Sequence, residues 1–137
     1  MSTADVALAS LRALQPDGNL DAAEALVAAD FHHHDAMPGT PPGRDGYRAV
    51  ANVLRAGFSD LRFEVEDVIA AGDRVAVRTW FTGTHDGPFM GMPPTGRRVR
   101  MQQVHVFRVE DGRIAEMWAV MDQLGALRQL GALAGPA

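Results

Sequence analysis

The apolar residues of this chain change their spacing close to residue 60, and this change constrains the fold more than any other feature. Before residue 60 they recur every three or four positions, which is typical of amphipathic helices. The spacing predicts helices near residues 4–15, 20–29 and 44–57. After residue 60 apolar and polar residues alternate, which predicts strands near residues 61–65, 75–84, 98–109 and 113–121. Helices that precede an antiparallel sheet indicate an α+β fold.

The last two predicted strands are joined by Glu-Asp-Gly-Arg, in which Asp-Gly is a strong signal for a two-residue hairpin turn. With Asp111 and Gly112 as the turn residues, Glu110 faces Arg113 and the strands pair outward from there. This register sets three pairs opposite each other: His105 with Trp118, Gln103 with Val120, and Met101 with Asp122. A β-bulge in either strand would shift these pairs.

All of these residues share one face of the predicted sheet, together with Phe107 and Glu116, because side chains alternate between the two faces of a strand. The face therefore combines a carboxylate, an imidazole and an amide with large apolar side chains. That composition is typical of a small-molecule pocket, which is mostly apolar with a few convergent polar groups. We predict a binding pocket on this face.

Length and composition exclude several classes of protein. The 137 residues suit one domain with its own core. The net charge of −4 argues against a nucleic-acid partner, because nucleic-acid-binding proteins usually carry a basic face. Without cysteine there is no disulfide, no thiolate nucleophile and no zinc–sulfur site. We see no signal-peptide pattern and no apolar stretch of membrane-spanning length, so we expect a cytoplasmic protein that is not membrane-bound.

Four segments carry a family resemblance: GTHDGPFMGMPPTGRRV at 83–99, FRVEDGRIAEMWAVMDQLGALRQLG at 107–131, DFHHHDAMPG at 30–39, and FSDLRFEVEDVIAAGDRVAVR at 58–78. They resemble the SnoaL-like polyketide cyclases of the nuclear transport factor 2-like superfamily. The resemblance covers nearly the whole chain and implies a single domain over residues 1–137. The implied fold is a cone-shaped α+β barrel, in which a strongly bent antiparallel sheet wraps around the N-terminal helices and encloses a cavity. It also implies a homodimer or homotetramer.

The resemblance further implies an intramolecular aldol ring closure that needs no cofactor and uses an aspartate as acid/base. Asp122 occupies the motif position of that aspartate, and His105 matches a second polar position of the cavity, where many relatives carry an acidic residue. The expected substrate is a hydrophobic polycyclic or polyketide-like small molecule. We expect seven further residues to bind it: His34, Gln103, Trp118, Phe89, Met90, Met101 and Phe107.

The proposed chemistry suits an apolar pocket. Desolvation raises the pKa of a carboxylate toward the working pH, where it is a more effective base. A substrate carbon flanked by two carbonyls is acidic enough to lose a proton to such a base. The enolate attacks a ketone of the same molecule, and the protonated carboxylate returns its proton to the new alkoxide.

Other readings remain open for these residues. Asp122 suits the N-cap of a helix at residues 123–131, and one residue can serve both roles. His105 is also compatible with a purely structural place beside Trp118. The run of three histidines does not predict a metal site, because consecutive side chains point in different directions on an extended chain. At the level of the whole protein, the alternatives are a binding protein that converts nothing, and an isomerase or epoxide hydrolase on the same fold.

Overall fold

The computed structural model of the protein describes residues 1–133. Over these residues the chain forms, in order, α1 (Thr3–Arg12), α2 (Leu20–Glu24), β1 (Val27–His33), α3 (Asp45–Gly57), β2 (Arg62–Ala71), β3 (Arg74–Thr84), β4 (Arg98–Glu110), β5 (Arg113–Met121) and α4 (Gln123–Gln129). The predicted α+β class is confirmed, as are the first and third predicted helices and the four predicted strands. None of the described helices is long and apolar enough to cross a membrane.

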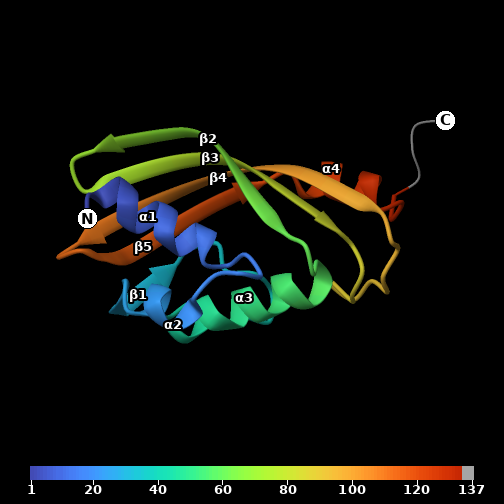
Figure 1. Ribbon diagram of the computed structural model, residues 1–137, viewed down its shortest axis with the longest axis horizontal. Helices are drawn as coiled ribbons and strands as arrows, with labels where there is room; N and C mark the ends of the chain where they lie inside the picture. The colour runs from blue at the N-terminus through green and yellow to red at the C-terminus, as the bar shows by residue number, and fades with distance from the viewer. Residues whose placement is uncertain (134–137) are drawn as a thin grey trace.

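The strands form one sheet in the order β1-β5-β4-β3-β2 (Figure 1). The four strands from β2 to β5 pair with antiparallel neighbours, as their alternating sequences predict. The prediction of a purely antiparallel sheet is wrong at one edge, because β1 joins β5 in parallel. The sheet is also open in the described residues, since β1 and β2 lie at its two edges and do not pair with each other.

The second predicted helix, at residues 20–29, is much shorter than expected. Asn19 caps it through a hydrogen bond from the backbone N–H of Ala22 to Oδ1 at 3.0 Å, but the helix ends at Glu24. The residues that follow extend along β5, where the N–H of Ile114 donates to Leu26. Sheet pairing across a long stretch of sequence has overridden the helical propensity of an alanine-rich segment.

The helices α1 and α3 lie on the same side of the sheet (Figure 1). The inner face of the sheet presents buried apolar side chains toward the helices, among them Val75, Val77, Phe81, Phe107 and Ile114. Helix α1 contributes Val6 and Leu11 to the same core, and α3 contributes Ala51 and Leu54. Apolar burial therefore fixes which face of the sheet is covered.

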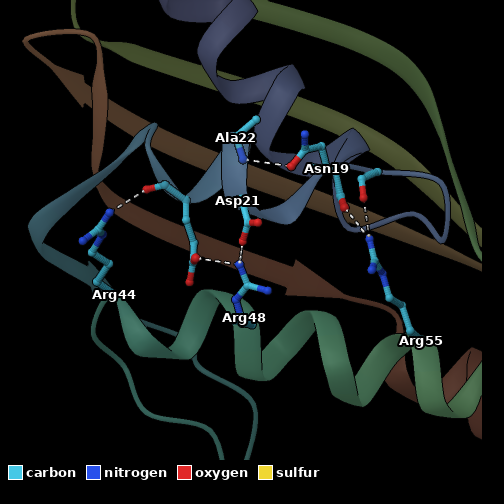
Figure 2. Close-up of polar contacts among 9 residues, drawn as sticks. Asn19, Asp21, Ala22, Arg44, Arg48 and Arg55 are labelled. Carbon is cyan, nitrogen blue, oxygen red and sulfur yellow. Dashed lines mark hydrogen bonds and ion pairs between the residues drawn. The ribbon is translucent and has the colours of Figure 1, made fainter.

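Arginines on α3 hold this helix against the segment that joins α1 to α2 (Figure 2). The Arg55 guanidinium donates to four backbone carbonyls of that segment, those of Ala13, Leu14, Gln15 and Gly18. Arg44 donates to the carbonyl of Glu24 at 3.1 Å. These bonds give partners to backbone carbonyls that follow the end of α1 and to one at the end of α2, where the helices supply none. They also fix the position of α3, which faces the cavity described below.

Candidate active site

An internal cavity with about 150 Å³ of free space lies between the helices and the inner face of the sheet. Its walls are mostly Phe, Met, Leu and Val side chains. Six lining residues have polar side chains: Ser10, His33, Tyr47, Gln103, His105 and Gln123. Within residues 1–133, no aspartate or glutamate lines this cavity. The cavity therefore suits an apolar ligand that carries a few polar groups.

The polar lining residues differ in whether their hydrogen-bonding groups are satisfied. The Tyr47 hydroxyl donates to the carbonyl of Ser10 at 2.6 Å, and the Ser10 hydroxyl donates to that of Ala7 at 2.7 Å. By contrast, Oε1 of Gln103 and Nδ1 of His105 are buried and have no partner among the described residues. A buried polar atom without a partner costs about 1–3 kcal/mol, so a ligand that supplies the missing bond gains affinity there.

Gln103 and His105 lie two residues apart on the inner face of β4, and their side chains are 5% and 6% exposed. On the neighbouring strand β3 they pair with Thr79 and Val77. The hydroxyl of Thr79 is fully buried and is a third atom without a described partner. Three unpaired polar atoms thus gather on adjacent strands, at one place on an otherwise apolar face.

Burial and, to a smaller extent, the charge of His33 together lower the pKa of His105 to about 4. The imidazole lies close to two phenyl rings, with centroids 6.4 Å from Phe63 and 6.0 Å from Phe107. In these surroundings a charged imidazolium is poorly solvated, which is the cause of the shift. At neutral pH His105 is a neutral ring that offers one donor and one acceptor nitrogen.

The predicted register of the β4–β5 hairpin holds only at the turn. Glu110 pairs with Arg113 as expected, and the positive φ angles of Asp111 (53°) and Gly112 (72°) fit a two-residue hairpin turn. Two residues further along, the register shifts, which leaves Ala115 without a partner. Such a bulge adds one residue to one strand, so every later side chain of β5 moves to the opposite face.

The predicted opposition of His105 and Trp118 is therefore wrong, and His105 faces Ala119 instead. Gln103 likewise pairs with Met121 rather than with Val120. The structure thus separates Trp118 from the imidazole and the amide.

Trp118, Glu116 and His34 meet on the outer side of the sheet, away from the cavity. The rings of His34 and Trp118 stack with centroids 4.6 Å apart, and Nε2 of His34 lies 3.0 Å from Oε1 of Glu116. The guanidinium of Arg74 lies 5.0 Å from the centroid of the Trp118 ring. His34 and Trp118, which we expected to bind the substrate, therefore do not line this cavity, and their binding role stays a prediction.

Asp122 is exposed at the end of β5, where it caps α4. Its Oδ1 accepts a hydrogen bond from the N–H of Gly125 at 2.9 Å. It does not pair with Met101, and it is not among the lining residues, although its neighbours Met121 and Gln123 are. The N-cap interpretation is confirmed, and the acid/base role stays a prediction for a carboxylate at the rim of the cavity.

Four of the predicted substrate-binding residues do line the cavity besides Gln103: Phe89, Met90, Met101 and Phe107. The loop that carries the first two is anchored to the end of α3, where the N–H groups of Asp86 and Gly87 donate to the carbonyl of Gly57. A Cβ on Gly87 would lie 1.8 Å from the carbonyl oxygen of Ala56, so only glycine permits this close approach.

His33 is a lining residue that the sequence analysis missed. It shares the inner side of β1 with Phe31, which is 7% exposed, while His32 between them is exposed. The alternation of Phe31 and His33 is a signal for this placement. This signal was hidden because the spacing of apolar residues just before it predicts a helix at residues 20–29.

Comparison with known proteins places the chain among cyclases. The family model described as SnoaL-like polyketide cyclase matches residues 5–130. Nogalonic acid methyl ester cyclase of Streptomyces nogalater is 32% identical over 116 residues, which cover 83% of this chain and 87% of that protein. Aklanonic acid methyl ester cyclase DnrD of Streptomyces peucetius is 30% identical over 117 residues, covering 83% of this chain and 81% of that protein.

Solved structures show the same similarity. Wild-type IdmH of Streptomyces antibioticus is 37% identical, with a TM-score of 0.80 over 96% of this chain and 99% of that one. TsrD of Streptomyces laurentii is 30% identical, with a TM-score of 0.79 over 96% and 93% of the two chains. The similarity extends over the elements that surround the cavity.

Proposed function

This chain belongs to the SnoaL-like polyketide cyclase family, and from that premise we propose that it closes a ring of a polyketide-derived substrate by an intramolecular aldol reaction. A carbon of the substrate loses a proton, the resulting enolate carbon bonds to a ketone carbon of the same molecule, and the alkoxide takes up the proton. No atom is gained or lost, so the product is an isomer of the substrate.

The observation that carries this proposal is the pair of unpaired polar atoms, Gln103 Oε1 and His105 Nδ1, in the wall of an apolar cavity. An aldol substrate offers hydroxyl and carbonyl groups to such atoms on an otherwise apolar body. The cavity holds about 150 Å³, and an apolar cavity of that volume accommodates about one six-membered ring. The ring being closed therefore fits inside, and any further rings extend through the mouth beside Met90.

We assign the acid/base role to Asp122, from its position in the motif, and a hydrogen-bonding role to His105. The carboxylate removes the proton from carbon and returns it to the alkoxide, while neutral His105 stabilises charge that develops on the substrate oxygen. In the structure Asp122 caps α4 outside the cavity. Proton transfer thus requires the carboxylate to release the N–H of Gly125 and turn toward the cavity.

A second candidate function is binding without conversion. It is favoured by the lining itself, since within residues 1–133 no carboxylate faces the cavity. A cavity of this kind retains an apolar ligand without supplying a strong base. Both functions predict that a substrate binds, and they differ in whether an isomer appears.

The direct test is to incubate the protein with nogalonic acid methyl ester and, separately, with aklanonic acid methyl ester, and to analyse the products by chromatography and mass spectrometry. We expect a new compound of unchanged mass, formed faster than in protein-free buffer. The double variant Gln103→Leu/His105→Leu removes both unpaired polar atoms from the cavity wall. It is the control that tests whether these side chains contribute to the reaction. Tight binding of either ester with no isomer formed would support the second candidate.

The proposal includes no cofactor. Among the described residues, no three histidine, aspartate or glutamate side chains are grouped to hold a metal ion. We expect turnover to survive exhaustive treatment with EDTA. Loss of turnover that zinc restores would contradict this part of the proposal.

A further inference from the structure

The three consecutive histidines of this chain have different surroundings. His32 and His34 are exposed and contact each other, with ring centroids 4.6 Å apart. His33, between them, points to the other side of the chain and lines the cavity. Strand geometry explains the division, because alternate residues of an extended segment share a side.

One nitrogen of His33 is occupied by the backbone. Nδ1 lies 3.0 Å from the backbone N–H of Asp35, which donates to it. A nitrogen that accepts a hydrogen bond cannot carry the proton of a neutral imidazole, so the proton lies on Nε2. The hydrogen bond therefore selects the tautomer in which Nε2 is the donor.

The segment that carries this ring is held on both sides. The carboxylate of Asp35 accepts from the N–H of Ala119 at 2.9 Å, directly across from His105 on the next strand. The N–H of His33 donates to the carbonyl of Pro42 at 2.8 Å, and the N–H of His34 donates to that of Met117 at 2.9 Å. The ring is thus attached to a fixed backbone at the edge of the cavity.

The pKa of His33 is lowered, which favours the neutral ring that a donor at Nε2 requires. Burial lowers its pKa, Asp35 raises it, and His32 and His34 lower it. In turn, the charge of His33 lowers the pKa of His105 on β4, so the two imidazoles are close to each other. Burial is the largest of these effects, so the ring is neutral at neutral pH and keeps its proton on Nε2.

We propose that Nε2 of His33 donates a hydrogen bond to the substrate oxygen that becomes the enolate, and that the Asp35 N–H fixes the tautomer that allows it. This role rests on the proposed ring closure. The ring hydrogen bond that His33 makes within the described residues is the one at Nδ1, which leaves Nε2 available to a ligand. His33 lines the same cavity as Gln103 and His105, whose Oε1 and Nδ1 are buried without a partner in the described residues. An oxygen that gains negative charge in the transition state is stabilised by a preorganised donor more strongly than the ketone from which it forms.

Two variants separate the roles of the two nitrogens. His33→Asn keeps an acceptor near Nδ1 for the Asp35 N–H but removes the donor at Nε2, so kcat should fall by about 10²-fold with the fold intact. His33→Gln places an amide N–H near Nε2 and should recover part of that loss. His32→Asn, on the exposed side of the same strand, is the matched control and should leave kcat unchanged. Equal kcat for wild type and His33→Asn would overturn the inference while leaving the ring-closing function intact.

A second measurement does not depend on turnover. The ring ¹⁵N signals that are missing from the spectrum of His33→Asn belong to His33. In the labelled wild-type protein these signals should be those of the Nε2–H tautomer. Dimedone, a one-ring 1,3-diketone that is an enolate at neutral pH, is the probe. It should shift the Nε2 resonance of His33, and its affinity should fall about tenfold or more in His33→Asn. An Nδ1–H tautomer, or dimedone binding that leaves the His33 signals unmoved, would refute the donor role even if no natural substrate is converted.

Discussion

Oδ1 of Asp122 accepts a hydrogen bond from the backbone N–H of Gly125 at 2.9 Å, so the residue that the family motif assigns to proton transfer is also the N-cap of α4. The carboxylate packs so closely on this glycine that a Cβ at position 125 would lie 2.2 Å from Oδ2. Proton transfer needs a carboxylate, whereas capping needs only an acceptor oxygen, so substitutions can separate the two roles.

Asp122→Asn should reduce turnover by about 10²–10⁴-fold, because an amide cannot accept the substrate proton. Thermal stability should change little, since asparagine caps helices nearly as well as aspartate. Asp122→Ala should lose the same turnover and about 1 kcal/mol of unfolding free energy. Kinetics and denaturant unfolding of both variants provide the measurements.

Gly125→Ala is the complementary control for Asp122, because it displaces the carboxylate from the cap without altering its chemistry. We expect its turnover to be retained. If Asp122→Asn is fully active, the carboxylate is a cap only. The acid/base role then passes to His105, which has an unpaired nitrogen in the cavity wall.

The stability of the protein should depend on pH through His105. Its pKa is about 4 in the folded protein, against an ordinary value of 6.5 when unfolded. Between these two values the unfolded chain binds a proton that the folded protein does not, so stability falls as the pH falls. From pH 7 to pH 5 the loss from this residue is about 2 kcal/mol.

The measurement for His105 is the unfolding free energy at several pH values, for wild type and for His105→Gln, which cannot titrate. The variant should lose less stability over the same interval, and the difference isolates His105 from His33, whose lowered pKa acts in the same direction. Parallel curves for the two proteins would show that His105 is not held neutral by burial.

The sequence predicted the strands well and the cavity in part, for identifiable reasons. Alternation along β4 placed Gln103, His105 and Phe107 on one face, and the structure keeps them there. The Asp-Gly turn was equally clear. The bulge at Ala115 left no signal, because alanine fits either face of a sheet and bulges depend on the pairing of whole strands. That single unpaired residue moved Trp118 to the outer side.

Strand β1 shows a different limit. Its first residues follow α2 and are rich in alanine, so local propensity favours a longer helix. The strand exists because it pairs in parallel with β5, more than 80 residues away along the chain, as the bond from His34 N–H to Met117 shows. Its histidines could not be assigned to faces before that pairing was known, and His34 was chosen from its match to the family pattern, which gave no sign of His33.

Arg55 should contribute strongly to stability. Its guanidinium donates to four carbonyls beyond the end of α1. A hydrogen bond to a charged group contributes about 1.5–3 kcal/mol, and bonds that share one half-buried guanidinium do not add in full. Arg55→Met keeps the apolar stem and should lower the unfolding free energy by about 2–3 kcal/mol. Arg48→Met, which removes ion pairs to Asp21 and Glu24 on the neighbouring exposed surface, should cost less than about 1 kcal/mol. Equal losses in denaturant unfolding would contradict this ranking.

The backbone of Met90 has a conformation that glycine and asparagine adopt more readily than methionine. It has a φ of 50° and is followed by Gly91 at 77°, within a two-residue turn closed by reciprocal hydrogen bonds between Phe89 and Met92. Turns of this kind favour Asn or Gly at the first central position, because a side chain such as methionine is strained there. Met90 is nonetheless 54% exposed at the mouth of the cavity. Strain at such a place points to a side chain that contacts the ligand.

Met90→Asn should therefore raise stability and weaken substrate binding in the same protein. Relief of the strained turn should add about 1 kcal/mol to the unfolding free energy. Loss of the thioether contact with a substrate ring, about 0.3–1.5 kcal/mol, should raise KM by roughly 2- to 10-fold with kcat little changed. Asp111→Asn is the matched control, because Asp111 has a φ of 53° in the turn between β4 and β5 and does not line the cavity. A Met90→Asn protein that is more stable and has an unchanged KM would show that the side chain does not touch the substrate.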